Sequence, residues 1–262
     1  MKIAVIILHY GNIETTKNCL RDLSKKIGEN RLILINNTQD EISSLTKIIP
    51  GTVLINNQKN LGFSAGVNVG IRLAMKDSAV THMFLMNNDL SISSGSFNQL
   101  VLTFNKFPNA GIVSPILHHP LGYDWGGKFN KWTGIVKHKN WINKPKTTQS
   151  VEHVAGAAMM ISREVVVKVG MLDERFFLYY EDLDYCLRAR RGGYTIHINP
   201  DVIADHAVSS GTSALGRTKF QWRSHIQFIN KHIFKLVYPT AYLYDLIFYP
   251  LVTLKLLLKG NK

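Results

Sequence analysis

The chain has 262 residues, of which 45% are hydrophobic and 10% aromatic, and this composition excludes a disordered chain. Its length favours one domain with an extension over two domains of equal size. Thirty-one Lys and Arg residues against eighteen Asp and Glu residues give a net charge of +13, which favours an anionic partner: nucleic acid, a membrane surface or a phosphorylated substrate.

The two cysteines, Cys19 and Cys186, lack metal-ligand spacing and lie in helical patterns. They are expected to be reduced core thiols of a cytoplasmic protein. The first ten residues lack the length and the cleavage site of a signal peptide, and they are typical of a strand.

The first 115 residues alternate between strand and helix patterns. Strands are expected at 2–8, 31–35, 53–56, 82–86 and 110–115, and helices at 14–25, 71–76 and 95–107. This alternation predicts an α/β fold with a doubly wound, mostly parallel central sheet. Ligands of such sheets bind beyond the carboxyl ends of the strands. Polar residues at these ends are His9, Tyr10, Asn12, Asn36, Asn37, Asn87, Asn88 and Asp89.

The second half has fewer clear elements. Residues 116–150, which include Trp125 and a lysine cluster, are expected to be irregular. A strand of small residues follows at 154–162, then a short helix at 164–170 and a strand at 194–199. His206 precedes a Ser/Gly-rich loop that ends near residue 216.

Residues 170–194 combine acidic and aromatic side chains in the stretch G-M-L-D-E-R-F-F-L-Y-Y-E-D-L-D-Y-C-L-R-A-R-R-G-G-Y. This mixture predicts a pocket wall, because loops seldom carry so many aromatics and cores seldom carry so many acids. A helix begins at Glu181, and its first turn favours ionised carboxylates of the kind a general base requires. The alternative is an acidic first turn with an Asp184–Arg188 pair.

This stretch resembles the G-x-x-D-E-x-F-F-x-Y-x-E-D-x-D segment of family 2 glycosyltransferases, the inverting enzymes of the GT-A fold. Residues 60–70 resemble the N-x-G-F-x-x-G-x-N-x-G element of the same family. The resemblance covers residues 1–215 and implies a donor-binding half at about 1–115 and an acceptor half at about 116–215. Residues 216–262 form a basic, amphipathic extension.

The resemblance implies a role for each matching residue. Asp182 corresponds to the catalytic base, Glu181 and Asp184 to its supporting neighbours, and Arg188 to a brace of the helix. The glycine-rich element implies donor binding, although packing of a helix on the sheet explains its glycines equally well. Its donor-binding residues would be Asn60, Gly62, Phe63, Gly66 and Asn68. The acceptor or transferred sugar would lie near Gly156, Ala157, Tyr180 and Trp125.

Residues 87–89, N-N-D, fall where the family carries D-x-D and holds Mg²⁺ or Mn²⁺ on the donor pyrophosphate. Asn87 departs from that pattern, whereas Asp89 matches the metal ligand and His206 matches a histidine that completes the site in several relatives. An ordinary turn is the alternative. Asn36 is a second departure from the family pattern. It leaves open whether the nucleotide of the donor is UDP or dTDP. The loop at 209–211 could close over the pyrophosphate.

The implied reaction is transfer, with inversion, of rhamnose or a similar hexose from a dTDP- or UDP-sugar to a glycan or lipid-linked saccharide in surface polysaccharide synthesis. One alternative is a non-catalytic sugar-nucleotide or lipid-binding domain, because Asn87 replaces an aspartate. The other is a basic nucleic-acid-binding protein, although no helix-turn-helix, zinc-finger or RNA-binding signature is present.

The C-terminal extension changes in character along its length. Residues 219–236 alternate basic and aromatic side chains at helical spacing, and residues 238–258 are apolar but contain Pro239, Asp245, Pro250 and Lys255. Because of these interruptions we expect an amphipathic segment at an anionic membrane surface rather than a spanning helix. Packing on the catalytic domain is the alternative. The expected location is the cytoplasmic face of the membrane.

Overall fold

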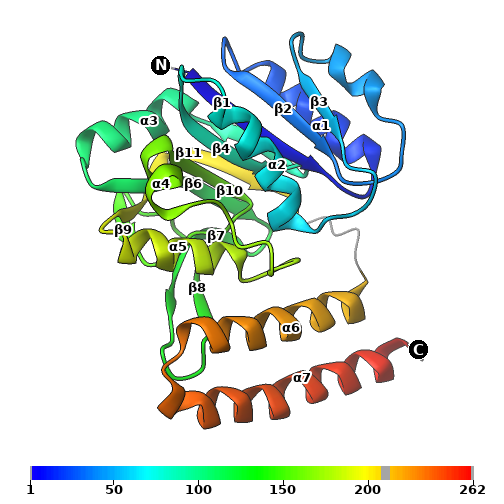
Figure 1. Cartoon of the computed structure of the whole chain (residues 1–262), viewed down its shortest axis with the longest axis vertical. Helices are drawn as coiled ribbons and strands as arrows, with labels where there is room; N and C mark the ends of the chain where they lie inside the picture. Colours follow the sequence, from blue (N-terminus) through cyan, green and yellow to red (C-terminus); the bar gives the residue numbers. More distant parts are fainter. Residues whose placement is uncertain (1, 208–212, 261–262) are drawn as a thin grey trace.

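The structure is a computed structural model that describes residues 2–207 and 213–260. An eleven-stranded sheet forms its centre, with main path β3-β2-β1-β4-β10-β6-β11-β5 (Figure 1). The strands are β1 (Lys2–His9), β2 (Arg31–Asn36), β3 (Val53–Asn56), β4 (Val80–Asn87), β5 (Leu90–Ser94), β6 (Ala110–His119), β7 (Gly122–Phe129), β8 (Val136–Trp141), β9 (Gln149–Val151), β10 (Ala158–Ser162) and β11 (Thr195–His206).

Most neighbours along the first half of the sheet are parallel. Strands β3, β2, β1 and β4 pair in parallel, as do β6 and β11. Strand β10 is antiparallel to β4 and β6, and β5 is antiparallel to β11. This arrangement confirms the predicted α/β class with a mostly parallel central sheet.

Helices cover both faces of the sheet. Helices α1 (Ile13–Ser24) and α3 (Phe97–Lys106) contribute to one core cluster, and α2 (Phe63–Met75), α4 (Arg163–Val169) and α5 (Glu181–Arg191) contribute to the other. Along β1, Val5 belongs to the first cluster and Ile6 to the second, because successive side chains of a strand point to opposite faces. Both faces are buried, which explains the nearly continuous apolar runs of the strands.

Helix α2 begins at Phe63, so the prediction of a helix starting at residue 71 is wrong. Gly66 and Gly70 therefore lie inside the helix, where glycine is intrinsically unfavourable. A Cβ atom at Gly66 would lie 2.7 Å from Leu8, and one at Gly70 would lie 2.6 Å from Ile6. The two glycines let α2 pack closely on β1, and this tertiary contact outweighs their low helix propensity.

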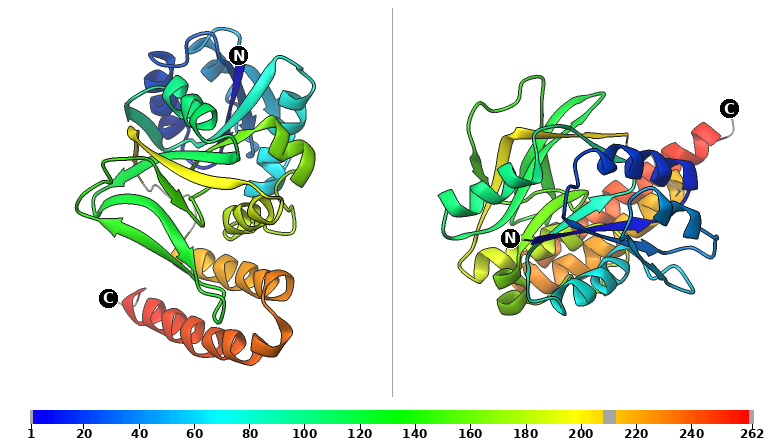
Figure 2. Two further views of the ribbon diagram at one scale, coloured as in Figure 1. Left: turned by 90° about the vertical axis from the view of Figure 1, so that its left-hand side faces the viewer. Right: turned by 90° about the horizontal axis from the view of Figure 1, so that it is seen from above.

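Residues 116–150 are not irregular as predicted, since β6 extends into them and they also form β7, β8 and β9. Strands β7 and β8 pair as an antiparallel hairpin whose register shifts between Asp124 and Gly127. This shift breaks the alternation by which a strand is found in a sequence. The hairpin extends from the sheet toward the C-terminal helices (Figure 2).

The C-terminal extension consists of α6 (Ala214–His232), a 3₁₀ turn η2 (Lys235–Val237) and α7 (Tyr238–Gly260). Figures 1 and 2 show α6 and α7 side by side and antiparallel at one end of the molecule. A third core cluster joins Leu183 and Leu187 of α5 to Phe228 and Ile229 of α6 and to Ala241 of α7. The extension is thus packed on the domain through α6.

Residues 238–258, which are expected to form an amphipathic segment, lie in the continuous helix α7. Pro239 lies in the first turn, where a missing N–H costs little, and the helix continues through Pro250. Asp245 is buried and pairs with His225 of α6. By length and composition alone, the segment Lys235–Leu258 could cross a membrane, and only 17% of its most apolar window is buried.

Candidate active site

A cavity of about 630 Å³ lies beyond the carboxyl ends of β1 and β4. It is lined by Leu8, Tyr10, Asn37, Asn60, Gly62, Phe63, Asn87, Asn88, Asp89, Phe177, Leu178, Tyr179, His206, Ser213, Arg217 and Phe220. Seven predicted donor-binding residues and both predicted metal ligands are among them. We call this space the donor cavity.

Three predicted donor residues at strand ends do not line the donor cavity. Asn12 caps α1 by accepting a hydrogen bond from the Glu14 N–H. The Asn36 side chain is buried, donates to the Asp40 carbonyl and to Asn56 Oδ1, and accepts from the Thr38 N–H. His9 is buried, with Nδ1 2.7 Å from the Thr16 hydroxyl, and burial lowers the pKa of His9. All three side chains make contacts within the protein, and their binding of a donor stays a prediction.

Two further donor predictions, Gly66 and Asn68, also lie outside the donor cavity. Gly66 packs on β1. The Asn68 carboxamide donates to the Leu172 carbonyl and to Glu174, and it accepts from the Leu172 N–H. Asn68 therefore ties α2 to the segment before α5, and its polar atoms are used in that contact.

The loop before α2 is held by one asparagine and one glycine. The Asn37 carboxamide accepts from the Leu61 N–H and donates to Asn60. Gly62 has φ of +81° and ψ of 178°, a conformation that is essentially restricted to glycine. A Cβ there would lie 2.5 Å from the Phe177 carbonyl oxygen, which accepts from the Phe63 N–H. The loop and residue 177 thus form one wall of the donor cavity.

Asp89 and His206 meet in the donor cavity although they are far apart in sequence. The unpredicted strand β5 pairs antiparallel with β11, which places His206 opposite Leu90. His206 Nε2 lies 3.3 Å from Asp89 Oδ1, and the Asp89 carbonyl accepts from the Ala207 N–H. The strand pairing therefore fixes both side chains at one point of the cavity wall.

This pair fits part of the coordination shell of a divalent cation. Carboxylate oxygen suits Mg²⁺ and Mn²⁺, and imidazole is a common partner ligand for first-row metals. Within residues 2–207 and 213–260, no group of three or more His, Cys, Asp or Glu side chains could hold a metal ion. Water and phosphate oxygens would have to supply the remaining ligands. The predicted loop at 209–211 lies outside the described residues.

The asparagines before Asp89 hold the edge of the donor cavity. The Asn87 N–H donates to the Ala157 carbonyl, which joins β4 to the residues before β10. Asn88 Nδ2 donates to the Thr16 hydroxyl at 2.8 Å and to the Tyr10 carbonyl at 3.2 Å. Both asparagines line the cavity and bond to other residues of the protein.

A second cavity of about 320 Å³ adjoins the first, and Tyr179 lines both. Its other lining residues are Ile135, Val136, His153, Tyr180, Glu181, Asp182, Leu183, Gln221, Tyr244, Phe248 and Tyr249. We call it the acceptor cavity, after the expectation for Asp182 and Tyr180. Trp125, also expected here, packs on the core cluster of α2 and is not among the lining residues of either cavity.

The Asp182 carboxylate is oriented by backbone donors. Oδ2 accepts from the Gly156 N–H at 2.9 Å, and Oδ1 accepts from the Leu183 N–H at 2.7 Å. His153 Nε2 lies 3.4 Å from Oδ1. A Cβ on Gly156 would lie 3.3 Å from the Asp182 Cβ, so the small residue permits this close approach. With 21% of its side chain exposed, Asp182 remains reachable from the cavity.

The backbone just before Asp182 is strained. Tyr179 and Tyr180 have φ of 71° and 68°, and they are the only described non-glycine residues with positive φ. Such conformations cost roughly 1–3 kcal/mol each and tend to occur at functional sites. The Tyr180 ring stacks on His225 of α6 at 5.0 Å between centroids. No residue type in this stretch indicates a left-handed turn, because both positions hold tyrosine rather than glycine or asparagine.

Glu181 is buried beside Asp182. Its pKa is raised well above the ordinary value, first by burial and then by the negative charges of Asp182 and Asp184. A proton therefore remains on Glu181 at pH values where the unfolded chain has lost it. Asp182, in contrast, keeps part of its carboxylate exposed to the acceptor cavity.

The raised pKa of Glu181 predicts a pH-dependent effect of Glu181→Gln on stability. Above the ordinary pKa of a glutamate, unfolding releases this proton, so the free energy of unfolding falls as pH rises until the folded-state pKa is reached. Glutamine does not titrate. We expect the stability of the variant relative to wild type to increase from pH 5 to 7, by at most about 1.4 kcal/mol per pH unit.

Chemical denaturation of both proteins at pH 5, 6 and 7 measures this difference. A constant difference across the series would show that Glu181 is ionised in the folded state.

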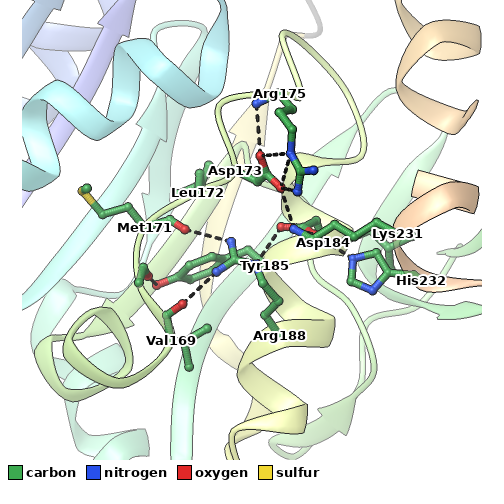
Figure 3. A network of polar contacts seen from close by, with 12 residues as sticks. Val169, Met171, Leu172, Asp173, Arg175, Asp184, Tyr185, Arg188, Lys231 and His232 are labelled. Atoms are coloured by element: carbon green, nitrogen blue, oxygen red, sulfur yellow. Dashed lines mark hydrogen bonds and ion pairs between the residues drawn. The ribbon is translucent and has the colours of Figure 1, made fainter. Parts of the chain in front are cut away.

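Asp184 and Arg188 form a bracing network away from both cavities (Figure 3). The buried Asp184 carboxylate bonds to Arg188 Nε at 2.8 Å and to His232 Nε2 at 2.7 Å, and it pairs with Lys231. Arg188 also donates to the carbonyls of Val169 and Met171. These contacts lock α5 to α6, so the two residues support the site through the position of α5.

The charge state of Asp184 follows from these partners. Burial acts to raise the pKa of Asp184. This effect is outweighed by the hydrogen bond from His232, the charge of Arg188 and the hydrogen bonds from Lys231 and Arg188. The pKa of Asp184 is therefore lowered. Sequence reasoning had identified Arg188 as a brace but missed Lys231 and His232, because their contact with α5 depends on how α6 packs. His153, Tyr179 and Arg217 at the two cavities were missed for the same kind of reason.

The chain is similar in sequence to a family of known proteins. Residues 2–224 match the family described as "Glycosyltransferase like family 2". The low-salt glycan biosynthesis hexosyltransferase of Haloferax volcanii is 28% identical over 198 residues, and the dTDP-rhamnosyl transferase RfbF of Shigella flexneri is 26% identical over 170. These matches cover 74% and 65% of this chain but only 63% and 55% of the two relatives.

Solved structures resemble the fold at lower identity. GalNAc-T7 with UDP, GalNAc and Mn²⁺ aligns with a TM-score of 0.70 at 14% identity, over 88% of this chain and 48% of the other. The mannosyltransferase PcManGT of Pyrobaculum calidifontis, in complex with GDP-Man and Mn²⁺, has a TM-score of 0.61 at 12% identity, over 96% and 71%. Because the family match covers most of its length, the chain belongs to glycosyltransferase family 2, and its fold is the GT-A fold.

Proposed function

We propose that this protein transfers rhamnose or a similar hexose, with inversion, from a dTDP- or UDP-sugar to a hydroxyl of a glycan or lipid-linked saccharide. The observation that carries the proposal is a pair of adjoining cavities, one with Asp89 and His206 and the other with Asp182. Tyr179 lies between them. A reacting sugar at this boundary would have its leaving group on one side and its acceptor on the other.

In the proposed reaction, Asp182 removes the proton from the acceptor hydroxyl. The acceptor oxygen then bonds to the anomeric carbon as the bond from that carbon to the nucleoside diphosphate breaks, and the diphosphate takes the bonding electrons. Arg217 in the donor cavity offers a positive charge to the diphosphate. Asp89 and His206 would hold Mg²⁺ or Mn²⁺, which neutralises negative charge on the leaving group.

A donor panel tests the nucleotide and the sugar. Purified full-length protein is heated with UDP- and dTDP-linked hexoses, each with and without Mn²⁺, and its melting temperature is recorded. We expect one nucleotide sugar to raise the melting temperature more than free nucleoside diphosphate does, because a bound ligand stabilises the folded state by mass action. A melting temperature that no nucleotide sugar raises would contradict a donor site.

We further propose that the protein works at an anionic membrane surface in surface polysaccharide synthesis, on the cytoplasmic side. Support comes from α6, where Lys219 and Arg223 are exposed, from Lys235 in η2, and from the apolar surface of α7. Lys231 and Arg217 are not part of this surface, because they face Asp184 and the donor cavity.

Reversing the three exposed charges to Glu should abolish the preference for anionic over neutral vesicles. Each basic residue near an anionic bilayer contributes about 1 kcal/mol, and salt screens this attraction. Cosedimentation at low and high salt measures the effect. The control reverses Lys26, Lys47 and Lys59, which are exposed on the sheet domain and change the net charge equally. If the folded triple variant still prefers anionic vesicles as wild type does, the charge of the extension is incidental.

A further inference from the structure

The acceptor cavity is built largely by the C-terminal extension and the hairpin tip. Helix α7 contributes Tyr244, Phe248 and Tyr249 to its lining, and α6 contributes Gln221. Ile135 and Val136 of the hairpin lie in the same lining. Helix α7 lies beyond residues 2–224, which match the family, and it provides an aromatic wall of the cavity.

Buried polar contacts fix α7 in this position. His225 of α6 bonds through Nδ1 to Asp245 of α7, and through Nε2 to the Thr133 carbonyl of the hairpin tip at 2.8 Å. Both side chains of the His225–Asp245 pair are almost completely buried. Such a pair is costly to bury unless its geometry is well satisfied, and breaking it would leave an uncompensated polar group. The buried pair therefore fixes the position of α7, and with it this wall of the cavity.

The same pair connects to the strained turn before Asp182. The His225 ring stacks on Tyr180, and Trp222 of α6 stacks on Tyr249 at 5.8 Å between centroids. Asp182 and the three aromatic residues of α7 line the same cavity. A hydroxyl at Asp182 consequently belongs to a molecule whose remainder meets an aromatic and apolar surface.

That surface continues out of the cavity onto the exposed face of α7. Phe248 lines the cavity and is itself 41% exposed. Other large apolar side chains exposed on α7 are Leu243, Leu246, Ile247, Leu251, Leu254, Leu257 and Leu258. A contiguous exposed apolar surface of this kind marks an interaction site. Because this surface is continuous with the cavity through Phe248, it indicates that the molecule bound in the cavity also covers the exposed face of α7.

We propose that the acceptor is an amphiphile, with its reacting hydroxyl at Asp182 and a long apolar chain that passes Tyr244 and Phe248 and lies along α7. This inference rests on the proposed function and narrows its acceptor to the lipid-linked class. An apolar chain on α7 removes its surface from water, while the saccharide remains in the acceptor cavity. The Asp182 carboxylate and the apolar helix thereby select different ends of one molecule.

Photolabelling tests the path of the chain without donor or turnover. The probe is octyl β-glucoside with a diazirine in its alkyl chain, used below its aggregation concentration with the full-length protein. Labelled residues are located by mass spectrometry. We expect saturable labelling at residues 135–136 and 244–251, which excess octyl β-glucoside suppresses and methyl β-glucoside does not.

Gln221→Trp provides the matched variant, because Gln221 is exposed at the cavity and an indole there would fill it without disturbing the core. It should lower the labelling at least about tenfold, the equivalent of 1.4 kcal/mol of binding. Lys219→Trp, at an exposed position of α6 outside the cavity lining, should leave the labelling unchanged.

Three results would overturn the inference. The first is labelling that spreads along α7 and does not change in the Gln221→Trp variant. The second is the absence of saturable labelling. The third is a dimer in light scattering whose second copy protects the exposed face of α7. Donor turnover without labelling would refute this inference alone. Labelling without turnover of any nucleotide sugar would instead refute the proposed function.

Discussion

Asp182→Asn is expected to lower the rate of sugar transfer at least about 10²-fold, the usual contribution of a general base. Asparagine keeps the shape of the side chain, and its carbonyl oxygen can still accept one of the backbone hydrogen bonds from Gly156 and Leu183. It cannot accept a proton from the acceptor. The affinity for the donor should hardly change, because Asp182 lines the acceptor cavity and not the donor cavity. Initial rates and donor titrations measure the two quantities.

Glu181→Gln is the matched control for this substitution. It also replaces a carboxyl group with an amide in the first turn of α5, but at a buried side chain whose pKa is raised by burial and by the charges of Asp182 and Asp184. Its rate should stay much closer to that of wild type. Transfer by Asp182→Asn at the rate of the Glu181 variant would remove Asp182 from the role of base.

Removal of divalent cations is expected to stop transfer, and Mn²⁺ or Mg²⁺ should restore it. Asp89→Ala and His206→Ala should each weaken metal-dependent donor binding at least about tenfold, because even residues that only support a metal ligand contribute 10–100-fold to metal affinity. Donor affinity is measured by titration at fixed Mn²⁺, with metal binding followed separately. Acceptor binding should be unaffected.

Asp205→Ala is the control for this pair, because Asp205 precedes His206 but bonds to His118 outside the donor cavity. It should bind the donor as wild type does. Full transfer in excess chelator would show instead that the replacement of an aspartate by Asn87 marks a metal-independent site.

Much of the donor cavity could be predicted because it depends on strand ends. Residues 87–89 follow a clearly apolar strand, and parallel strands bring their carboxyl ends together. Asp89 and His206 were paired by resemblance, but the strand that joins them was not predicted. Strand β5 is short and its partner β11 is far along the chain, so no local pattern marks their pairing.

The side-chain amides were the least predictable part of the site. Asn36, Asn37 and Asn68 all looked suitable for binding a donor, since each can donate and accept hydrogen bonds. In the structure only Asn37 lines the donor cavity, and Asn36 and Asn68 bond to nearby backbone groups. Buried polar groups must be satisfied somewhere, and the sequence does not say whether a ligand or the chain itself will satisfy them.

The C-terminal extension shows a different limit of sequence reasoning. Asp245 looked like an interruption of an apolar segment, because an unpaired charge in such a helix is unfavourable. Its partner His225 lies twenty residues earlier, on a helix whose packing no local pattern reveals. Once the two are paired, α7 is continuous and provides one wall of the acceptor cavity.

The central claim is tested most directly by the anomeric configuration of the product. The nucleotide sugar that most stabilises the protein is incubated with a lipid-linked acceptor, and the new glycosidic bond is assigned by nuclear magnetic resonance. The account predicts one new bond with the anomeric configuration opposite to that of the donor, formed together with one equivalent of nucleoside diphosphate. A product that retains the donor configuration would contradict it.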